Sequence, residues 1–394
     1  MKRIFLCIDG TSNAAEVAPG RPTPSNVLVF ARALRGFDLD GHAQVIGYMR
    51  GVGTDDSAGV IRRALAQATG NGFSQLILEA YEFLANNYNL GDQVYLLGFS
   101  RGAAAARSLS GFTELFGLLP NRCRAFLPQA WEYYNTHPQH RHLGQLQGAN
   151  AELAEIAKEG VDLLLGHTRE TAEDMRAGLA EGPENPDPRT HGFLERVRER
   201  TLAAAEEGRA VYVPLYLHFV GVWDTVFHVD SQGFHEGRLA WNVGMARQAL
   251  AIHEVRSDFP PALWTGKCRH QDVKQVWFPG AHSDVGGGNG NEPRSSLALD
   301  WMVQQVLGHS RGRADFDYKF LNGHATRDPA APLSTPQDDL LWTFRRRERR
   351  AIGGLFQFRS RLADDWTMTH PTYGWRDRDI LTGADAAATA LPLE

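Results

Sequence analysis

The chain has 394 residues, of which 43% are hydrophobic and 22% charged, and its formal net charge at pH 7 is −5. This composition is typical of a globular protein with one large domain or two ordinary ones. Because no basic face is implied, we expect no nucleic-acid partner. The three cysteines have no CxxC spacing, so the sequence favours neither a disulfide framework nor a metal site.

The N-terminal segment has the pattern of a buried strand. Its apolar run, residues 4–8, is followed at once by Asp9 and Gly10, and it is too short for the core of a signal peptide. No stretch approaches the roughly 20 apolar residues that cross a bilayer. We therefore expect a protein that resides in the cytoplasm of the producing cell, and any export would need a route without a cleaved signal.

Strand and helix patterns alternate along the first third of the chain. Strands are predicted at residues 4–8, 44–49 and 93–97, and helices at 24–34 (capped by Ser25), 73–87 and 102–119. Two later strands are predicted at 211–223 and 274–278. This alternation predicts an α/β fold with a mostly parallel sheet flanked by helices. We expect a single domain over residues 1–394, with a helical insertion at 121–208 as a candidate lid.

The segment 94–102 carries the pattern G-x-S-x-G at Gly98, Ser100 and Gly102, between a predicted strand and a predicted helix. A serine on such a sharp turn needs small neighbours on both sides, because side chains two residues away would collide. The turn exposes the hydroxyl and directs the next backbone N–H toward a developing oxyanion. The pattern therefore predicts Ser100 as a nucleophile and the Arg101 amide as an oxyanion donor.

A second G-x-S-x-G, at residues 308–312, serves as an internal comparison. It follows a helical pattern at 297–307, so Gly308 is predicted to cap a helix and no strand leads into Ser310. We therefore predict no catalytic role for Ser310.

A nucleophilic serine needs a base and an acid that orients the base, and in α/β-hydrolases both follow the serine in loops after later strands. Asp224 follows the predicted strand at 211–223, and His282 follows the one at 274–278. Asp224 and His282 are therefore the predicted acid and base. His370 is the alternative base, and Asp284 is the alternative acid, although it is so close to His282 in sequence that a supporting hydrogen-bond role is favoured.

A second oxyanion donor is expected from the loop after the strand beside the elbow strand. The loop that begins at Gly10 and Thr11 follows the first predicted strand, so one of these two amides is the candidate. Chemistry of this kind requires no metal and no organic cofactor.

Two segments suggest contact with lipid. Aromatic residues cluster at Trp131, Tyr133 and Tyr134 within the predicted insertion, where they would line an acyl pocket or form a local core. The basic run at residues 345–350 could touch an anionic membrane surface transiently, although such runs are more often solvated faces.

Five motifs together resemble the domain of unknown function found in lipase effectors of the type VI secretion system. They are Asp-Gly-Thr-x-Asn at 9–13, Gly-Val-Gly-Thr at 51–54, Gly-Phe-Ser-Arg-Gly-Ala at 98–103, Gly-Val-Trp-Asp-Thr-Val at 221–226, and Trp-Phe-Pro-Gly-Ala-His-Ser-Asp-Val-Gly-Gly-Gly at 277–288. The likeness also includes residues 249–264 and 297–302, and it extends to about residue 305.

The resemblance implies an α/β-hydrolase whose catalytic triad falls on Ser100, Asp224 and His282. It also implies phospholipase A activity against the membranes of rival bacteria, with a secretion component or an immunity protein as expected partners. Two alternatives remain: an esterase or thioesterase for small soluble substrates, and a binding protein on an inactive hydrolase fold. The sequence leaves the oligomeric state and the acyl-position specificity open.

Overall fold

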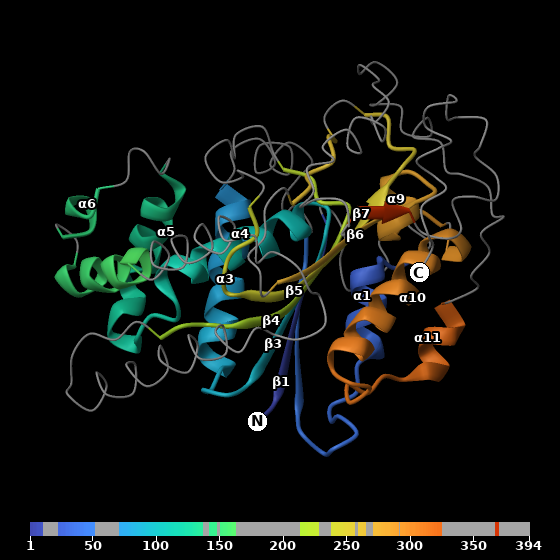
Figure 1. Ribbon diagram of the computed structural model, residues 1–394, viewed down its shortest axis with the longest axis horizontal. Coiled ribbons are helices and arrows are strands. Elements are labelled where there is room, and N and C mark those ends of the chain that lie inside the picture. The colour runs from blue at the N-terminus through green and yellow to red at the C-terminus, as the bar shows by residue number, and fades with distance from the viewer. Residues whose placement is uncertain are drawn as a thin grey trace, which may run out of the picture.

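A seven-stranded sheet runs through the centre of the protein in the computed structural model (Figure 1). Its order is β2-β1-β3-β4-β5-β6-β7, and every neighbouring pair of strands is parallel. This confirms the predicted α/β fold. The strands are β1 (Arg3–Ile8), β2 (Gln44–Met49), β3 (Gln93–Phe99), β4 (Leu217–Trp223), β5 (Val243–Ala251), β6 (Asp272–Phe278) and β7 (Thr367–Thr369).

The structure describes the chain in several separate segments. They are residues 1–10, 23–51, 71–136, 142–147, 150–162, 213–227, 238–256, 259–264, 271–290, 292–324 and 367–369. Thr11, His370 and the basic run at 345–350 lie outside the described residues, so the predictions made for them stay predictions.

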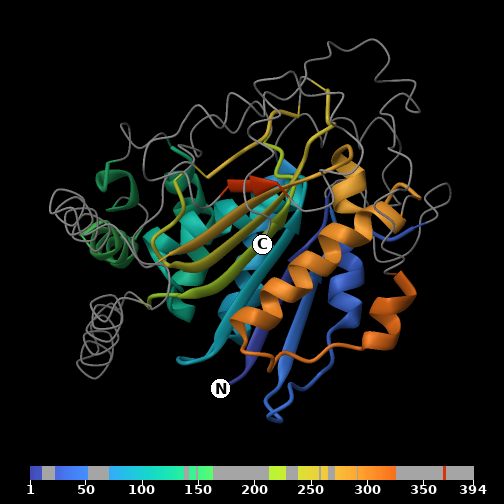
Figure 2. The same cartoon turned by 45° about the vertical axis from the view of Figure 1, so that its right-hand side comes forward.

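Helices cover both faces of the sheet (Figures 1 and 2). On one face lie α3 (Asn71–Asn87) and α4 (Arg101–Phe116), and on the other lie α1 (Asn26–Ala33), α10 (Glu292–His309) and α11 (Tyr318–His324). Ser25 caps α1 as predicted, because its Oγ accepts the Leu28 N–H at 3.1 Å.

The alternation of side chains along β1 shows how the sheet divides two apolar cores. Ile4, Leu6 and Ile8 pack into the cluster that includes α3 and α4, whereas Phe5 and Cys7 pack into the cluster that includes α1 and α10. Successive side chains of a strand point to opposite faces, so a strand that is apolar at every position is buried on both sides. This is why the continuous apolar run at residues 4–8 forms an inner strand.

The described part of the predicted insertion packs on α4. The rings of Trp131 and Tyr134 lie 5.5 and 5.6 Å from that of Phe112, and the ring of Tyr133 lies 6.1 Å from that of Phe116. The aromatic cluster therefore forms a local core. Residues 163–208 are not described, so the lid stays a prediction. The described elements here are η1 (Asn121–Phe126), α5 (Leu127–Asn135), α6 (Gly144–Gln147) and the helical residues 151–162.

The predicted helix end at Gly308 is wrong, because α10 continues to His309. The left-handed residues that end it are Arg311 (φ 54°) and Gly312 (φ 71°). The Ser310 hydroxyl donates to the Leu307 carbonyl at 3.2 Å and accepts the Ala314 N–H at 3.1 Å. Its role in this turn agrees with the prediction that no strand leads into Ser310.

The order of the strands determines where a site can form. The chain moves from β1 outward to β2 and then returns across β1 to β3, so the connections leave in opposite directions between β1 and β3. Ligands of open parallel sheets bind in the crevice outside the carboxyl ends of the strands at such a point. Gly10 follows β1 and Ser100 follows β3, so both lie at this position.

Two partly buried histidines, His218 in β4 and His309 at the end of α10, are held in the neutral form. His218 accepts the Val94 N–H at Nδ1, at 3.2 Å, which only an unprotonated nitrogen does. Burial, and then the charge of nearby His309, lowers the pKa of His218 to about 3. Burial, followed by the charge of Arg247, lowers the pKa of His309 to about 4.

Stability is therefore expected to fall as the pH drops from about 7 to about 5. In the unfolded chain these histidines bind protons near their ordinary pKa of 6.5, whereas the folded protein resists protonation down to the lower values. The unfolded state then holds more protons, which favours unfolding. Thermal unfolding across this range checks the expectation, and His218→Asn, which can still accept the Val94 N–H, should flatten the decline. An equally steep decline in this variant would contradict the assignment.

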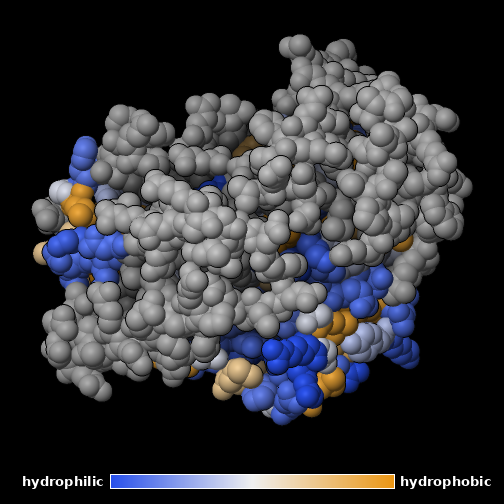
Figure 3. Space-filling view, viewed as in Figure 1, coloured by the Kyte–Doolittle hydropathy of each residue, from blue (hydrophilic) through white to orange (hydrophobic). Residues whose placement is uncertain are grey.

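The described surface seen in Figure 3 is mainly hydrophilic. The exposed large hydrophobic side chains among the described residues are Met1, Phe37, Leu39, Leu90 and Tyr318. Within the described segments, no helix combines the length and the apolar character that a membrane crossing requires.

Candidate active site

Ser100 sits on a strained turn between β3 and α4. Its backbone has φ 56° and ψ −122°, a conformation that residues with a Cβ rarely adopt. The end of β4 and the loop after it hold this turn. The Ser100 N–H donates to the Trp223 carbonyl at 3.0 Å, and the Ser100 carbonyl accepts the Val226 N–H at 3.4 Å. The strand therefore delivers the serine beside the loop that carries Asp224.

The glycines on either side of Ser100 are required by close contacts. A Cβ at Gly98 would lie 2.6 Å from the carbonyl oxygen of Gly102. A Cβ at Gly102 would lie 2.2 Å from the carbonyl oxygen of Ile8 and 2.4 Å from that of Asp9. Since these are backbone atoms, they cannot rotate away. Gly102 thus allows the start of α4 to rest directly on the end of β1, where Gly10 lies.

Asp224 is fully buried, and both of its carboxylate oxygens are engaged. One oxygen accepts the Ala251 N–H at 3.0 Å, and the other lies 2.7 Å from Nδ1 of His282. Its φ of 37° makes it one of three non-glycine residues with positive φ in the described segments, and Ser100 is another. Strained backbone of this kind gathers at functional sites.

His282 begins the short helix α9 (His282–Gly286) after β6, and its ring contacts two phenylalanines. The ring centroid of Phe99 is 4.7 Å away and that of Phe259 is 5.0 Å away. Phe99 directly precedes Ser100 in the chain, so the predicted base contacts the residue before the predicted nucleophile. A Cβ at Gly286 would come within 1.9 Å of the Phe99 ring, which explains one glycine of the run after His282.

The carboxylate of the alternative acid, Asp284, forms hydrogen bonds with nearby residues of its own loop. Its carboxylate accepts the Ala281 N–H at 3.0 Å and the Asn289 side-chain amide at 3.0 Å. These bonds stabilise the start of α9 and the loop after it. Asp284 therefore has the supporting hydrogen-bond role that its closeness to His282 in sequence favours.

The backbone N–H groups predicted to bind the oxyanion differ in whether they already have an acceptor. Arg101 is the first residue of α4, and first-turn N–H groups have no acceptor within their helix. The Gly10 N–H donates to the Asp9 carboxylate at 2.7 Å, so this amide is already engaged. Thr11, the other residue whose amide is predicted as a donor after β1, lies outside the described residues, so its role stays a prediction.

Asp9 connects the end of β1 to the start of α1 and to β2, a role that the sequence patterns did not reveal. Besides the Gly10 N–H, its carboxylate accepts the hydroxyls of Ser25 at 2.5 Å and Tyr48 at 2.7 Å. Burial, followed by the charge of Asp9, raises the pKa of Tyr48 well above its ordinary value, so the phenol remains a donor. Ser25 also pairs with Gly287 in an isolated bridge, which ties this network to the residue after α9.

Residues 2–305 match the family described as the catalytic domain of Tle1-like phospholipase effectors of the type VI secretion system. The chain belongs to this family. Membership implies an ester hydrolase and agrees with the resemblance that the five sequence motifs carry.

Individual relatives of this Tle1-like chain are distant. An uncharacterized protein of Saccharomyces cerevisiae, YEL023C, is 30% identical over 168 residues, which cover 40% of this chain and 24% of the relative. An uncharacterized Pseudomonas aeruginosa structure is 15% identical with a TM-score of 0.38, and the match covers 83% of this chain and 49% of that one. The structure of the Tle1 effector bound to the VgrG spike is 18% identical with a TM-score of 0.27, and the match covers 74% of this chain and 51% of that one. The chain thus spans about half the length of the solved chains it matches, and less of the yeast relative.

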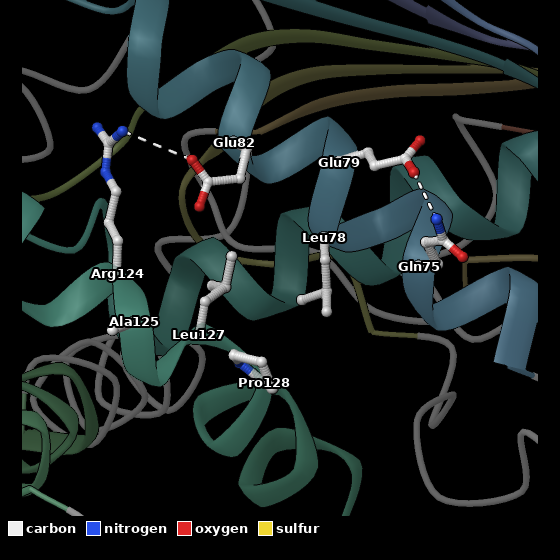
Figure 4. Close-up of a pocket in the computed structure, with 8 residues that line it drawn as sticks. All are labelled: Gln75, Leu78, Glu79, Glu82, Arg124, Ala125, Leu127 and Pro128. Carbon is white, nitrogen blue, oxygen red and sulfur yellow. Dashed lines mark hydrogen bonds and ion pairs between the residues drawn. The ribbon is translucent and has the colours of Figure 1, made fainter.

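A groove of about 530 Å³ lies outside the site of this Tle1-like domain, between α3 and the segment η1–α5 (Figure 4). Its lining residues belong to α3, η1 and α5, and neither Ser100 nor His282 is among them. Arg124 and Glu82 form an ion pair of 3.5 Å at this groove. The lining residues are Gln75, Leu78, Glu79, Glu82, Arg124, Ala125, Leu127 and Pro128.

Among the described residues, Asp38, Asp40 and His42 are the one group close enough together to share a metal ion. They precede β2, so they lie at the amino ends of the strands, opposite Ser100. Asp38 pairs with Arg3 and accepts the N–H groups of Asp40 and His42, at 2.9 and 2.8 Å. These contacts account for the cluster as a tight loop.

Proposed function

We propose that this chain is a serine esterase that cleaves a carboxylic ester of membrane phospholipids through an acyl-enzyme. The observation that carries the proposal is the 2.7 Å contact between Asp224 Oδ2 and His282 Nδ1, beside the strained turn of Ser100. A serine, a histidine and a buried carboxylate in this relation form the recurring machinery of acyl transfer. Membership in a phospholipase effector family supports lipid as the substrate.

In the acylation step, Ser100 Oγ bonds to the ester carbonyl carbon while His282 Nε2 takes the hydroxyl proton. An imidazole that donates from Nδ1 to Asp224 presents Nε2 as the acceptor, so the buried carboxylate selects the useful tautomer. The oxyanion that forms is bound by the Arg101 and Thr11 amides. The ester C–O bond then breaks, and His282 returns its proton to the leaving alcohol, which is a lysophospholipid.

Deacylation repeats the sequence with water. His282 takes a proton from the water as its oxygen bonds to the acyl carbon, and the second oxyanion is bound by the same two amides. When the bond to Ser100 Oγ breaks, the proton passes from His282 to Ser100 and the fatty acid leaves. No metal ion or organic cofactor takes part in these steps.

The partners we propose follow from the family. The substrate is a lipid at a membrane surface, which the chain contacts transiently. A component of the secretion apparatus would carry the protein out of the producing cell. An immunity protein would protect the producer. Each of these is a proposal that rests on family membership rather than on contacts in the structure.

The substrate class is tested with p-nitrophenyl esters of increasing chain length and with a phospholipid that fluoresces on release of one acyl chain. We expect the rate to rise with chain length and to extend to the phospholipid. Hydrolysis of short esters alone would instead indicate an esterase or thioesterase for small soluble substrates. No hydrolysis of any ester would indicate a binding protein on a hydrolase fold.

A further inference from the structure

We propose that Glu254 is a positioning residue for the catalytic histidine, acting together with Arg256 and Phe259. The inference rests on the proposed function, because it assigns a role to residues around His282. Glu254 belongs to the segment 249–264, which shares the family likeness but contains no residue of the triad.

The Glu254 carboxylate binds the backbone at the point where His282 enters its helix. Glu254 follows β5, its side chain is fully buried, and its Oε2 accepts the His282 N–H at 3.2 Å. A buried carboxylate that accepts a backbone amide fixes that amide more firmly than a neutral acceptor does. Asp224 therefore orients the imidazole, and Glu254 fixes the backbone that carries it.

Arg256 holds this carboxylate in its ionised form. Its Nε donates to Oε1 and its guanidinium Nη2 donates to Oε2, both at 2.8 Å, and its own backbone N–H donates to Oε1 at 2.9 Å. Burial alone would raise the pKa of Glu254, but the hydrogen bonds and the charge of Arg256 outweigh burial and lower the pKa below its ordinary value. Glu254 is thus a charged acceptor at neutral pH.

The same arginine contacts one of the two phenylalanine rings that touch the imidazole. Its guanidinium carbon lies 3.7 Å from the centroid of the Phe259 ring, within the range of a cation–π contact. The Phe259 ring meets the His282 ring edge-on, at 82° and 5.0 Å. One ion pair therefore supports His282 in two ways, through its backbone and through its ring.

The loop after β5 is also attached to the loop after β6 by backbone contacts. The Ile252 N–H donates to the Phe278 carbonyl at 3.1 Å, and the His253 N–H donates to the Gly280 carbonyl at 2.9 Å. In return, the Gly280 N–H donates to Nδ1 of His253 at 2.9 Å. Glu254 ends this row of contacts, so the loop after β5 acts as a rigid support for the loop that carries the base.

The expected effect of Glu254→Gln is a loss of about tenfold in kcat with KM unchanged, because small misplacements of a catalytic group slow the chemical step rather than binding. The measurement is steady-state hydrolysis of a p-nitrophenyl ester by the full chain. The same substitution is made in a His282→Ala background. In that background Glu254→Gln should leave the residual rate unchanged, because the imidazole that Glu254 positions is absent. A merely structural role would lower both rates alike.

Glu114 provides the matched control. It is a buried glutamate on α4 that accepts the Trp241 N–H at 2.7 Å and pairs through both oxygens with Arg238, at 2.8 and 2.6 Å. It lies fourteen residues after Ser100 in the sequence, roughly 20 Å away along the helix. Glu114→Gln breaks the same kind of contact, so we expect a similar loss of thermal stability and an unchanged kcat.

Phe259→Leu keeps the ion pair intact and removes only the ring contact, so it tests the proposal even if Glu254→Gln fails to fold. We expect it to lower kcat several-fold without changing KM. If Glu254→Gln and Phe259→Leu both fold and keep the wild-type kcat while His282→Ala is inactive, this inference is wrong and the triad stands. If His282→Ala itself keeps the wild-type rate, the proposed function is wrong and the inference with it.

Discussion

Replacing Ser100 by alanine is expected to lower kcat by about 10⁶-fold, to the rate that the remaining site supports without a nucleophile. The substitution removes one oxygen and leaves the turn in place, because the turn is held by backbone contacts to Trp223 and Val226. The melting temperature should therefore stay close to that of the wild type. Ester hydrolysis and thermal unfolding of the same preparation measure the two quantities.

Ser310 supplies the control, because it lies in the other G-x-S-x-G of the chain. Its hydroxyl bonds to Leu307 and Ala314 in the turn after α10. Ser310→Ala should keep the wild-type kcat and lose a little stability. Wild-type rates in Ser100→Ala would show that another group is the nucleophile, and the proposed mechanism would then fail.

The two G-x-S-x-G motifs also show why the surrounding sequence, and not the motif alone, predicted the nucleophile. Both have the same glycine spacing, but only Ser100 is preceded by an apolar strand pattern, and only Ser100 lies at the carboxyl end of a strand. The parallel sheet was predictable for the same reason. β1, β2 and β3 carry continuous or alternating apolar runs, which are what a buried strand requires.

β5 was not predicted, although it lies between β4 and β6 within the sheet. Its sequence places the polar residues Arg247 and Gln248 in the middle of the strand, so the apolar run is broken. The structure accommodates both in buried positions. Arg247 pairs with Asp272 at 2.6 Å, and Gln248 accepts the Thr225 hydroxyl at 2.7 Å. Such partners come from distant parts of the chain, so no local pattern indicates them.

The residues of the candidate site also fall into those that local sequence patterns predicted and those that depend on distant contacts. Ser100, Asp224 and His282 each follow a strand, and the G-x-S-x-G motif together with the chain order of serine, acid and base in such loops selected them. Glu254 also follows a strand, but that strand was the unpredicted β5. Asp9 was visible as the start of a tight loop, yet its contacts with Ser25 and Tyr48 depend on the packing of α1 and β2 around it.

Asp224→Asn is expected to lower kcat by about 10⁴-fold with little change in fold. The reason lies in the two engaged oxygens. An asparagine has one oxygen, and if this oxygen keeps the bond to the Ala251 N–H, its amide group faces Nδ1 of His282. Nδ1 must then accept a hydrogen bond, so the imidazole proton moves to Nε2 and the base can no longer accept the proton of Ser100. Asparagine tolerates the positive φ of 37° found here, so the backbone need not move.

Asp284→Asn is the matched control, because Asp284 is two residues from His282 and was the alternative acid. Its two carboxylate oxygens each accept a hydrogen bond, and an asparagine keeps only one acceptor oxygen, so the replacement should cost about 1 kcal/mol of stability, as the loss of one hydrogen bond does. Its kcat should remain within about tenfold of the wild type. If Asp284→Asn lost as much activity as we expect of Asp224→Asn while the latter stayed active, the acid would be Asp284. The 2.7 Å contact between Asp224 and His282 would then be structural, and Asp284 would be the group that orients the imidazole.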